Sequence, residues 1–219
     1  MVFLLPIIGM PSEYVNIFFS GAVLIGGLFE SMSTILRVVT DIEKNGTLRY
    51  ELSLPCSRWP VILKLLFSHT LRVLFSSLIF LVLGKILMWN LFDLSAISIP
   101  KLLVALGLTG ILTGVLALFY ASFICDVSDI SFVWRSGLYP FLIIGGNLFP
   151  WRAVDSFSPI VGKLFLLNPI MLASEAIRVS LLGPNGYLPF WVSGVGLLFC
   201  SFVFGIFGFI QLKKRLDMF

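Results

Sequence analysis

The sequence predicts an all-α polytopic membrane protein with about five transmembrane helices, a short cytoplasmic helix and an external re-entrant helical hairpin. Of its 219 residues, 58% are hydrophobic and 12% are charged, whereas soluble domains contain roughly one quarter charged residues. Long apolar runs recur along the chain, and a helix needs roughly 20 such residues to cross a bilayer. The Lys and Arg residues gather in a few short segments beside these runs, a distribution typical of membrane topology.

The first predicted span covers about residues 14–39. Its glycines suit close packing between helices in lipid. Arg37, near the end of the span, is expected at the membrane interface. Glu30 lies about two helical turns deeper, where a charge is costly, so we expect it to face protein or water. Two interpretations of Glu30 stay open: a proton-relay carboxylate, or a buried carboxylate paired with a neighbouring helix.

A polar, mixed-charge segment, residues 40–59, follows this span. Gly46 is expected to break the helix or to supply a positive-φ turn, and Thr47 offers an N-cap hydroxyl for a short helix. Leu48 would lie on the apolar side of that helix, and Pro55 would end it. An isolated helix of this length is marginal in water. The segment is therefore either a helix that docks on a soluble partner or an ordinary solvated loop.

The second and third predicted spans cover about residues 60–89 and 101–125. His69 and Arg72 lie one turn apart in the second span, where a packed or interfacial pair is a simpler interpretation than an acid–base site. The third span contains a GxxxG motif at residues 110–114. This motif favours a close helix contact, but it is common in membrane helices and is weak evidence alone.

The fourth predicted span, about residues 130–149, is broken. Pro140 removes a backbone donor, and Gly145 and Gly146 add local conformational freedom. Residues 150–183 then contain apolar runs that are too short to cross a bilayer. We therefore expect an external re-entrant or interfacial helical hairpin over this region.

Glu175 and Arg178, spaced i,i+3 inside the predicted hairpin, are most simply a local ion pair. The last predicted span covers about residues 187–212 and has no charged residue. The tail, residues 213–219, begins with three basic residues and is expected to anchor the helix end.

The distribution of basic residues predicts the orientation. Residues 1–14 contain no Lys or Arg. The tail and the polar segment with its flanks are basic, so both are expected in the cytoplasm and the N-terminus outside. Five spans satisfy this arrangement, which is that of a multi-pass protein of the plasma (inner) membrane. The basic residues of the polar segment and its flanks are Arg37, Lys44, Arg49, Arg58 and Lys64.

Several chemistries lack their sequence signals. The chain contains no GxxxxGK[ST], GxSxG or HExxH motif, so we expect no enzyme activity and no ATP site of its own. Cys56, Cys125 and Cys200 are far apart and indicate neither a disulfide framework nor a metal site. They are interpreted as small buried apolar residues. The net charge of +4 forms no basic stripe, so nucleic acid is not an expected partner.

Short motifs recur in a fixed order along the chain. The first span ends in Arg37, and an acidic-basic turn, a Gly-Thr step, a Leu-rich short helix and a Pro-x-Ser-Arg step follow it up to Arg58. Downstream lie GGNLFPW at residues 145–151 and NPIMLASEAIRVSLLG at residues 168–183. In this order and spacing, the motifs resemble those of permease subunits of type-2 ABC (ABC-2) exporters. The Phe29-Glu30-Ser31 triplet is similar to the branch that exports polysaccharides and lipo-oligosaccharides.

The resemblance implies a membrane-spanning permease that moves a glycan, glycolipid or other amphipathic substrate out of the cell. ATP and Mg would bind a separate ATPase subunit, and a second permease copy would complete a homodimer or heterodimer. The residues expected at or near the ATPase contact are Glu43, Gly46, Thr47, Leu48, Arg49 and Glu51. Those expected in the translocation path are Glu30 and Arg37. Those expected at an outer gate are Pro140, Gly145, Gly146, Pro150, Asn168, Pro169, Glu175 and Arg178.

One feature departs from the family pattern. Members normally have six spans, and the first of these has no counterpart here, so we expect a fragment, a late start or a second chain that supplies it. Two other functions stay open. A secondary transporter or channel would use Glu30 and the broken helix at Pro140, although such folds often show matched interrupted helices in both halves and only one is found here. The other is a non-transporting (degenerate) membrane assembly subunit.

Overall fold

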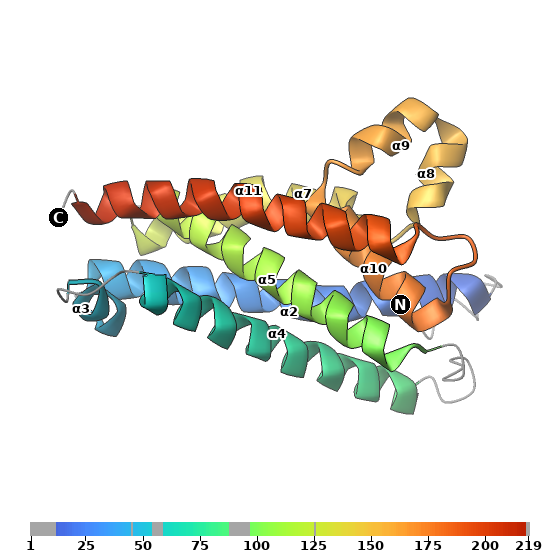
Figure 1. Ribbon diagram of the computed structural model, residues 1–219, viewed down its shortest axis with the longest axis horizontal. Helices are drawn as coiled ribbons and strands as arrows, with labels where there is room; N and C mark the ends of the chain where they lie inside the picture. The colour runs from blue at the N-terminus through green and yellow to red at the C-terminus, as the bar shows by residue number, and fades with distance from the viewer. Residues whose placement is uncertain (1–11, 45, 54–58, 88–96, 125, 218–219) are drawn as a thin grey trace.

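The computed structural model describes residues 12–44, 46–53, 59–87, 97–124 and 126–217. Every regular element in these ranges is helical. Four of the helices are long and apolar enough to cross a membrane, and they run side by side along the long axis of the molecule (Figure 1). These helices confirm the general prediction of an all-α polytopic membrane protein. The four are α2 (Ser12–Glu43), α4 (Trp59–Leu87), α5 (Ile99–Phe123) and α11 (Phe190–Asp217).

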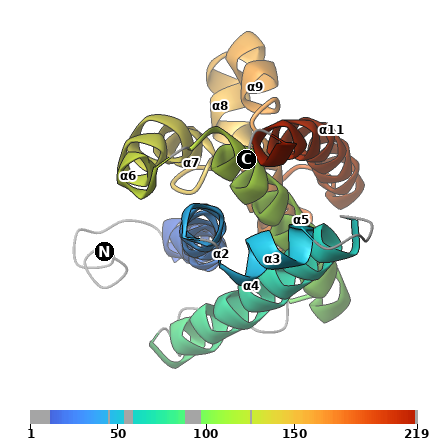
Figure 2. The ribbon, with the colours of Figure 1, turned by 90° about the vertical axis from the view of Figure 1, so that its left-hand side faces the viewer.

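Helices α2, α5 and α11 run in one direction along the bundle, and α4 runs in the opposite direction (Figure 1). The short helix α3 (Thr47–Ser53) follows α2, and it lies at the same end of the bundle as the end of α11 (Figure 1). We call this the α3 end. Seen from it, α3 lies beside α2 and α4 (Figure 2). The polar segment and the C-terminal helix therefore share one end, as the predicted arrangement of spans requires.

Helix α5 is the centre of the bundle and packs against α2, α4, α10 and α11. It is apolar throughout its membrane-spanning length, so it tolerates neighbours on all sides. The GxxxG motif lies at the contact with α4. A Cβ on Gly110 would lie 2.9 Å from Thr70 Cγ2, and one on Gly114 would lie 2.8 Å from His69 Cδ2. Both glycines are therefore required for this close approach of the two helices.

The predicted fourth span is shorter than expected. The helices α6 (Ile130–Val133), η3 (Trp134–Leu138, a π-helical stretch) and α7 (Tyr139–Ile144) follow the 3-10 turn η2 (Val127–Asp129) and form one helical stretch. Its 15 residues extend only about 22 Å, less than the roughly 30 Å hydrocarbon core. The helix stops because the chain turns at Gly145 and Gly146, where Gly146 has φ 72°.

The region predicted as a re-entrant hairpin divides into two parts. Helices α8 (Trp151–Phe157) and α9 (Pro159–Phe165) project from the side of the bundle, whereas α10 (Pro169–Leu182) lies inside it (Figure 1). Helix α10 is buried from Pro169 to Leu181. The axes of α9 and α10 differ by 95°, and the pair is long and apolar enough to count as one bent span. The sequence predicted a span over residues 130–149. In the structure, the fifth candidate span is instead the bent pair of α9 and α10.

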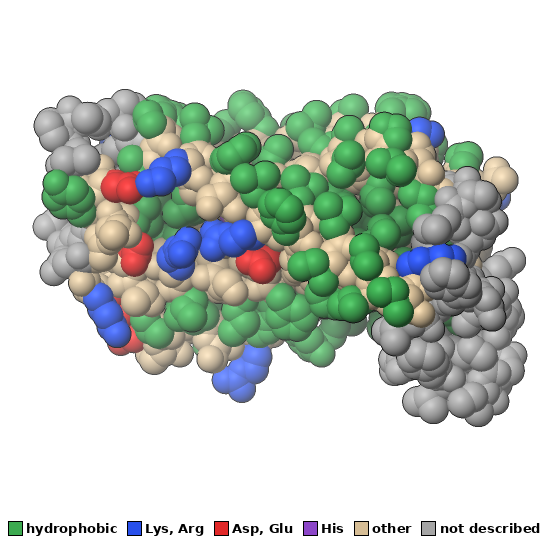
Figure 3. All heavy atoms as spheres, turned by 90° about the horizontal axis from the view of Figure 1, so that it is seen from below, with side chains coloured by type: hydrophobic (Ala, Val, Ile, Leu, Met, Phe, Trp, Pro, Cys, Tyr) green, Lys and Arg blue, Asp and Glu red, His purple; other side chains and the backbone are tan. Residues whose placement is uncertain are grey.

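The outer surface of the long helices is strongly apolar. Exposed residues include Phe67, Phe75 and Ile79 on α4 and Phe199 and Phe202 on α11. On the face seen in Figure 3, hydrophobic side chains cover most of the described surface, and charged side chains gather toward the α3 end. A soluble monomer rarely exposes so large an apolar area, so this surface fits a hydrocarbon environment.

Candidate functional site

In the described part of the polar segment, the end of α2 is followed by the short helix α3. Lys44 N donates to Thr40 O at 2.9 Å, and Gly46 N donates to Asp41 O at 2.7 Å, which closes the end of α2. Gly46 lies at the break between α2 and α3, as one of the two expectations for it states. Its role is spatial, because a Cβ at this position would lie 2.9 Å from the Asp41 Cα.

The side chain of Asp41 caps the start of α3. Its Oδ2 accepts hydrogen bonds from Leu48 N and from the Thr47 hydroxyl, each at 3.4 Å. The expected cap was Thr47 itself, but the acceptor comes from the preceding helix. A carboxylate at a helix N-terminus also complements the helix dipole. The only sequence signal for this role is the position of Asp41 shortly before a Gly-Thr turn.

Two further contacts hold α3 in place. Leu48 is buried in the apolar cluster at the α3 end, together with residues such as Ile42 and Ile62. Lys64 Nζ on α4 donates to Glu51 Oε1 at 2.6 Å, an ion pair at the protein surface. Leu48 and Glu51 thus attach α3 to the spans. Their expected place at an ATPase contact stays a prediction.

The opposite side of this segment is open to solvent. Glu43, Lys44 and Thr47 are exposed, and Tyr50 is 67% exposed. Aromatic residues presented in this way are frequent anchors of protein interfaces. The side chains of Arg49 and Leu52, and the whole of residues 54–58 with Pro55 and Arg58, lie outside the described residues.

Glu30 and Arg37 lie on the same helix but in different surroundings. Glu30 is half-buried, and no ion pair or hydrogen bond joins it to another described side chain. The expected pairing with a neighbouring helix is therefore not found in the described part of the chain. Arg37 is exposed and lines a cavity between α2, α3 and α4. The assignment of both residues to a translocation path stays a prediction.

His69 is a packed histidine inside the bundle. Its Nδ1 lies 2.8 Å from Thr34 Oγ1 on α2, and its Nε2 lies 3.1 Å from Thr113 Oγ1 on α5. Both ring nitrogens are thus satisfied, and the ring joins three helices across the α2–α4–α5 contact. Arg72, one turn further along α4, donates from Nε to Ser68 O at 3.3 Å. The packed interpretation of His69 is confirmed, and a pair with Arg72 is not formed.

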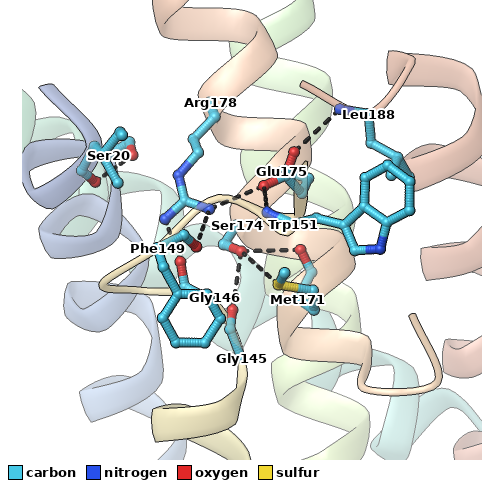
Figure 4. Close-up of polar contacts among 11 residues, drawn as sticks. Ser20, Gly145, Gly146, Phe149, Trp151, Met171, Ser174, Glu175, Arg178 and Leu188 are labelled. Atoms are coloured by element: carbon cyan, nitrogen blue, oxygen red, sulfur yellow. Dashed lines mark hydrogen bonds and ion pairs between the residues drawn. The ribbon is translucent and has the colours of Figure 1, made fainter. Parts of the chain in front are cut away.

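Glu175 and Arg178 on α10 form a completely buried ion pair, with 3.0 Å between Arg178 Nη1 and Glu175 Oε1. The carboxylate also accepts from Trp151 N at 2.9 Å and from Leu188 N at 3.1 Å. The guanidinium donates to Phe149 O at 3.1 Å and to Gly146 O (Figure 4). The pair is therefore more than the local contact that its spacing indicates. We call Glu175, Arg178 and their four backbone partners the re-entrant hub.

The start of α10 is fixed to the broken helix by polar contacts. Asn168 caps α10 by accepting from Ile170 N at 3.0 Å, and its Nδ2 donates to Phe141 O at 2.8 Å. Ser174 Oγ donates to Gly145 O at 2.9 Å (Figure 4). A Cβ on Gly146 would overlap the sulfur of Met171.

The structure brings most of the predicted outer-gate residues together. Gly145 and Gly146 form the turn, Pro150 precedes α8 and Pro169 begins α10. Pro140 lies near Asn168 in a separate shallow pocket. The predicted set did not include four other contributors: Phe149, Trp151, Ser174 and Leu188.

Metal and cysteine chemistry has little support in the described part of the chain. No group of three or more His, Cys, Asp or Glu residues there has the geometry to hold a metal ion. Cys200 is a free, half-buried cysteine in α11. Cys56 and Cys125 lie outside the described residues.

Comparison of the chain with protein-family models, curated proteins and solved structures found no match.

Proposed function

We propose that this chain is the permease subunit of an ATP-driven ABC exporter that works with a separate ATPase subunit and a second permease copy. The observation that supports this best is the attachment of α3. A short helix is held across the ends of α2 and α4 by the Asp41 cap, by buried Leu48 and by the Glu51–Lys64 ion pair. An ordinary solvated loop has no need of three such attachments.

This attachment suits the transmission of movement. A partner that displaces α3 would also displace α2 and α4, because α3 contacts both. ATP, bound with Mg to the partner, would favour one arrangement of the spans, and its hydrolysis would favour the other. The exposed side chains of Glu43, Lys44 and Tyr50 would face the partner.

At the other end, the re-entrant hub would let the outer segment move as a unit. Residues 146–151 are tied to α10 through Glu175 and Arg178. In the proposed orientation the hub lies near the outer leaflet of the plasma membrane, and the α3 end lies in the cytoplasm. The substrate class, a glycan, glycolipid or other amphipathic molecule, rests on the motif resemblance.

One observation favours a second candidate, a secondary transporter or channel. Glu30 is half-buried within a membrane-spanning helix and lacks a side-chain partner in the described residues. Intramembrane carboxylates of this kind mark ion and proton pathways. Export that needs Glu30 but no ATPase would support this candidate.

Co-purification tests the exporter proposal. The tagged chain would be expressed with each candidate ABC ATPase subunit from the same genome, and recovery and ATP turnover would be measured for the wild type and for Glu43→Lys. Glu43 is exposed beside α3, so its charge reversal should weaken the complex while membrane insertion is unchanged. Asp129→Lys is the matched control, because Asp129 is an exposed acid on η2 beside α2 and not on α3. Equal recovery of all three proteins would contradict the proposal.

A further inference from the structure

A cavity of about 370 Å³ opens at the α3 end between α2, α3 and α4. Its size lies within the roughly 300–1,000 Å³ of small-molecule sites. It is unusual for the surface of a membrane bundle because charged side chains dominate its polar lining. The charged and hydroxyl side chains that the argument uses are Arg37, Asp41, Glu51, Lys64, Ser68 and Arg72.

The two carboxylates of this cavity already have partners. Asp41 accepts the hydrogen bonds that begin α3, and Glu51 accepts from Lys64 at 2.6 Å. These contacts neutralise one cation and fix the wall that α3 contributes. Glu51 is thus balanced by Lys64, and the single carboxylate of Asp41 remains to balance the two arginines.

The two arginines are largely uncommitted. Arg37 makes no ion pair or hydrogen bond with another described residue. Arg72 lines the cavity and donates from Nε to the carbonyl of Ser68 at 3.3 Å, and its two terminal nitrogens have no hydrogen-bond partner among the described residues. Two arginines from different helices therefore line one cavity, in which the three basic side chains Arg37, Lys64 and Arg72 outnumber the two carboxylates.

The depth of the arginines makes this arrangement costly if the cavity stays empty. The Thr34–His69 hydrogen bond sets α2 and α4 side by side at this level. Arg37 lies one turn from Thr34 toward the α3 end, and Arg72 lies one turn from His69 in the other direction. Arg72 is thus about 20 Å along α4 from Trp59. An arginine at that depth is expensive in lipid unless an anion or water accompanies it.

We propose that this cavity binds a phosphate group, held between Arg37 and Arg72 with Lys64 at the rim. The planar fork of arginine fits phosphate oxygens with two parallel hydrogen bonds. Basic pockets between membrane helices are established sites for lipid headgroups. A cation is disfavoured because the uncommitted charge is positive. The phosphate comes from a phospholipid headgroup or from a soluble phosphate ester, since both present the same chemistry.

The surroundings accommodate a lipid as well as a soluble compound. Phe67, Leu71 and Phe75 form an exposed apolar row on α4 beside Ser68 and Arg72, where acyl chains would lie. Because α3 forms one wall, a bound phosphate would also hold α3 against α2 and α4. The inference does not depend on the exporter proposal, since it rests on the cavity alone.

Binding of two probes to the purified full chain in detergent tests the inference. The probes are dihexanoyl phosphatidic acid and glycerol 3-phosphate, titrated against the wild type, Arg37→Gln and Arg72→Gln. Each substitution should weaken binding by about tenfold or more, because each removes a charge-assisted contact. Arg37→Lys, which keeps the charge and loses the fork, should bind with intermediate affinity.

The matched control is Arg135→Gln. Arg135 is exposed and donates from Nε to Ser131 O at 3.2 Å, the same local contact that Arg72 makes, but it does not line the cavity. Its substitution should leave affinity unchanged. Arginine-dependent binding of the lipid alone identifies a headgroup site, and equal binding of both probes identifies a site for the phosphate ester itself. Absence of saturable binding, or equal losses in Arg72→Gln and Arg135→Gln, overturns the inference.

Discussion

The α3 end and the re-entrant hub both contain an acid–base ion pair, but the two pairs have different consequences. The Glu51–Lys64 pair is exposed, with 69% of the Lys64 side chain accessible to solvent. Both members of the Glu175–Arg178 pair are fully buried. An exposed pair positions a helix at little energetic gain, whereas a buried pair cannot lose one partner without stranding a charge. The hub is thus a rigid structural unit, and the α3 end is adjustable.

The largest expected effect comes from breaking the hub. Glu175→Ala leaves Arg178 buried without its carboxylate and removes the acceptor of Trp151 N and Leu188 N. We expect a loss of about 3–5 kcal/mol in the free energy of unfolding. Thermal unfolding followed by size-exclusion chromatography in detergent measures it. A change in the unfolding temperature no larger than that of Lys163→Ala, an exposed residue on α9, would contradict the structural role of the pair.

A smaller effect is expected from the histidine that joins three helices. His69→Leu removes the partner of Thr34 and Thr113 inside the bundle. The Thr34 hydroxyl loses its described partner, and an unsatisfied buried group costs about 1–3 kcal/mol, whereas the Thr113 hydroxyl still donates to Thr109 O at 2.9 Å. Chemical denaturation in mixed micelles measures the loss. A His69→Leu variant with the same free energy of unfolding as the wild type would contradict this prediction.

A local effect is expected at α3. Asp41→Ala removes the cap that Leu48 N and Thr47 use, which should cost about 0.5–2 kcal/mol of helix stability. Because α3 is a surface element, we expect faster amide hydrogen exchange in residues 47–53 and little change in α5. Uniformly faster exchange across the bundle would show that Asp41 has a global role instead.

The smallest effect is expected from the exposed ion pair. Glu51→Gln should change the free energy of unfolding by at most about 1 kcal/mol, since solvent and salt screen this pair. Denaturation at low and high salt measures it. A loss as large as that of Glu175→Ala would remove the distinction between the two ends of the molecule.

The positions of the long helices were predictable because each one coincides with a long apolar run in the sequence. The GxxxG motif also lies at a helix contact, between α4 and α5. The predicted fourth span, residues 130–149, is helical over residues 130–144, where Gly145 and Gly146 turn the chain. Composition alone does not show that α10, which is short, is buried inside the bundle.

The contacts of the two candidate regions were harder to predict because they depend on the folded arrangement. Glu175 accepts hydrogen bonds from Trp151 N and Leu188 N. Because almost every residue type has a backbone N–H, the sequence does not indicate which ones act as donors. Asp41 caps a helix that begins after a chain reversal. Arg37 and Arg72 share a cavity only because of the register between α2 and α4. The residue types were visible, but their partners were not.

The most direct test of the central claim, that α3 carries the contact with an ATPase subunit, is site-specific photocrosslinking. A photoreactive phenylalanine analogue would replace Tyr50, which is 67% exposed on α3, or Phe157, which is 89% exposed on α8 near the other end. After irradiation of membranes that contain both proteins, we expect an adduct of the permease and the ATPase from position 50 and none from position 157. No adduct from position 50, or equal adducts from both positions, would contradict the account.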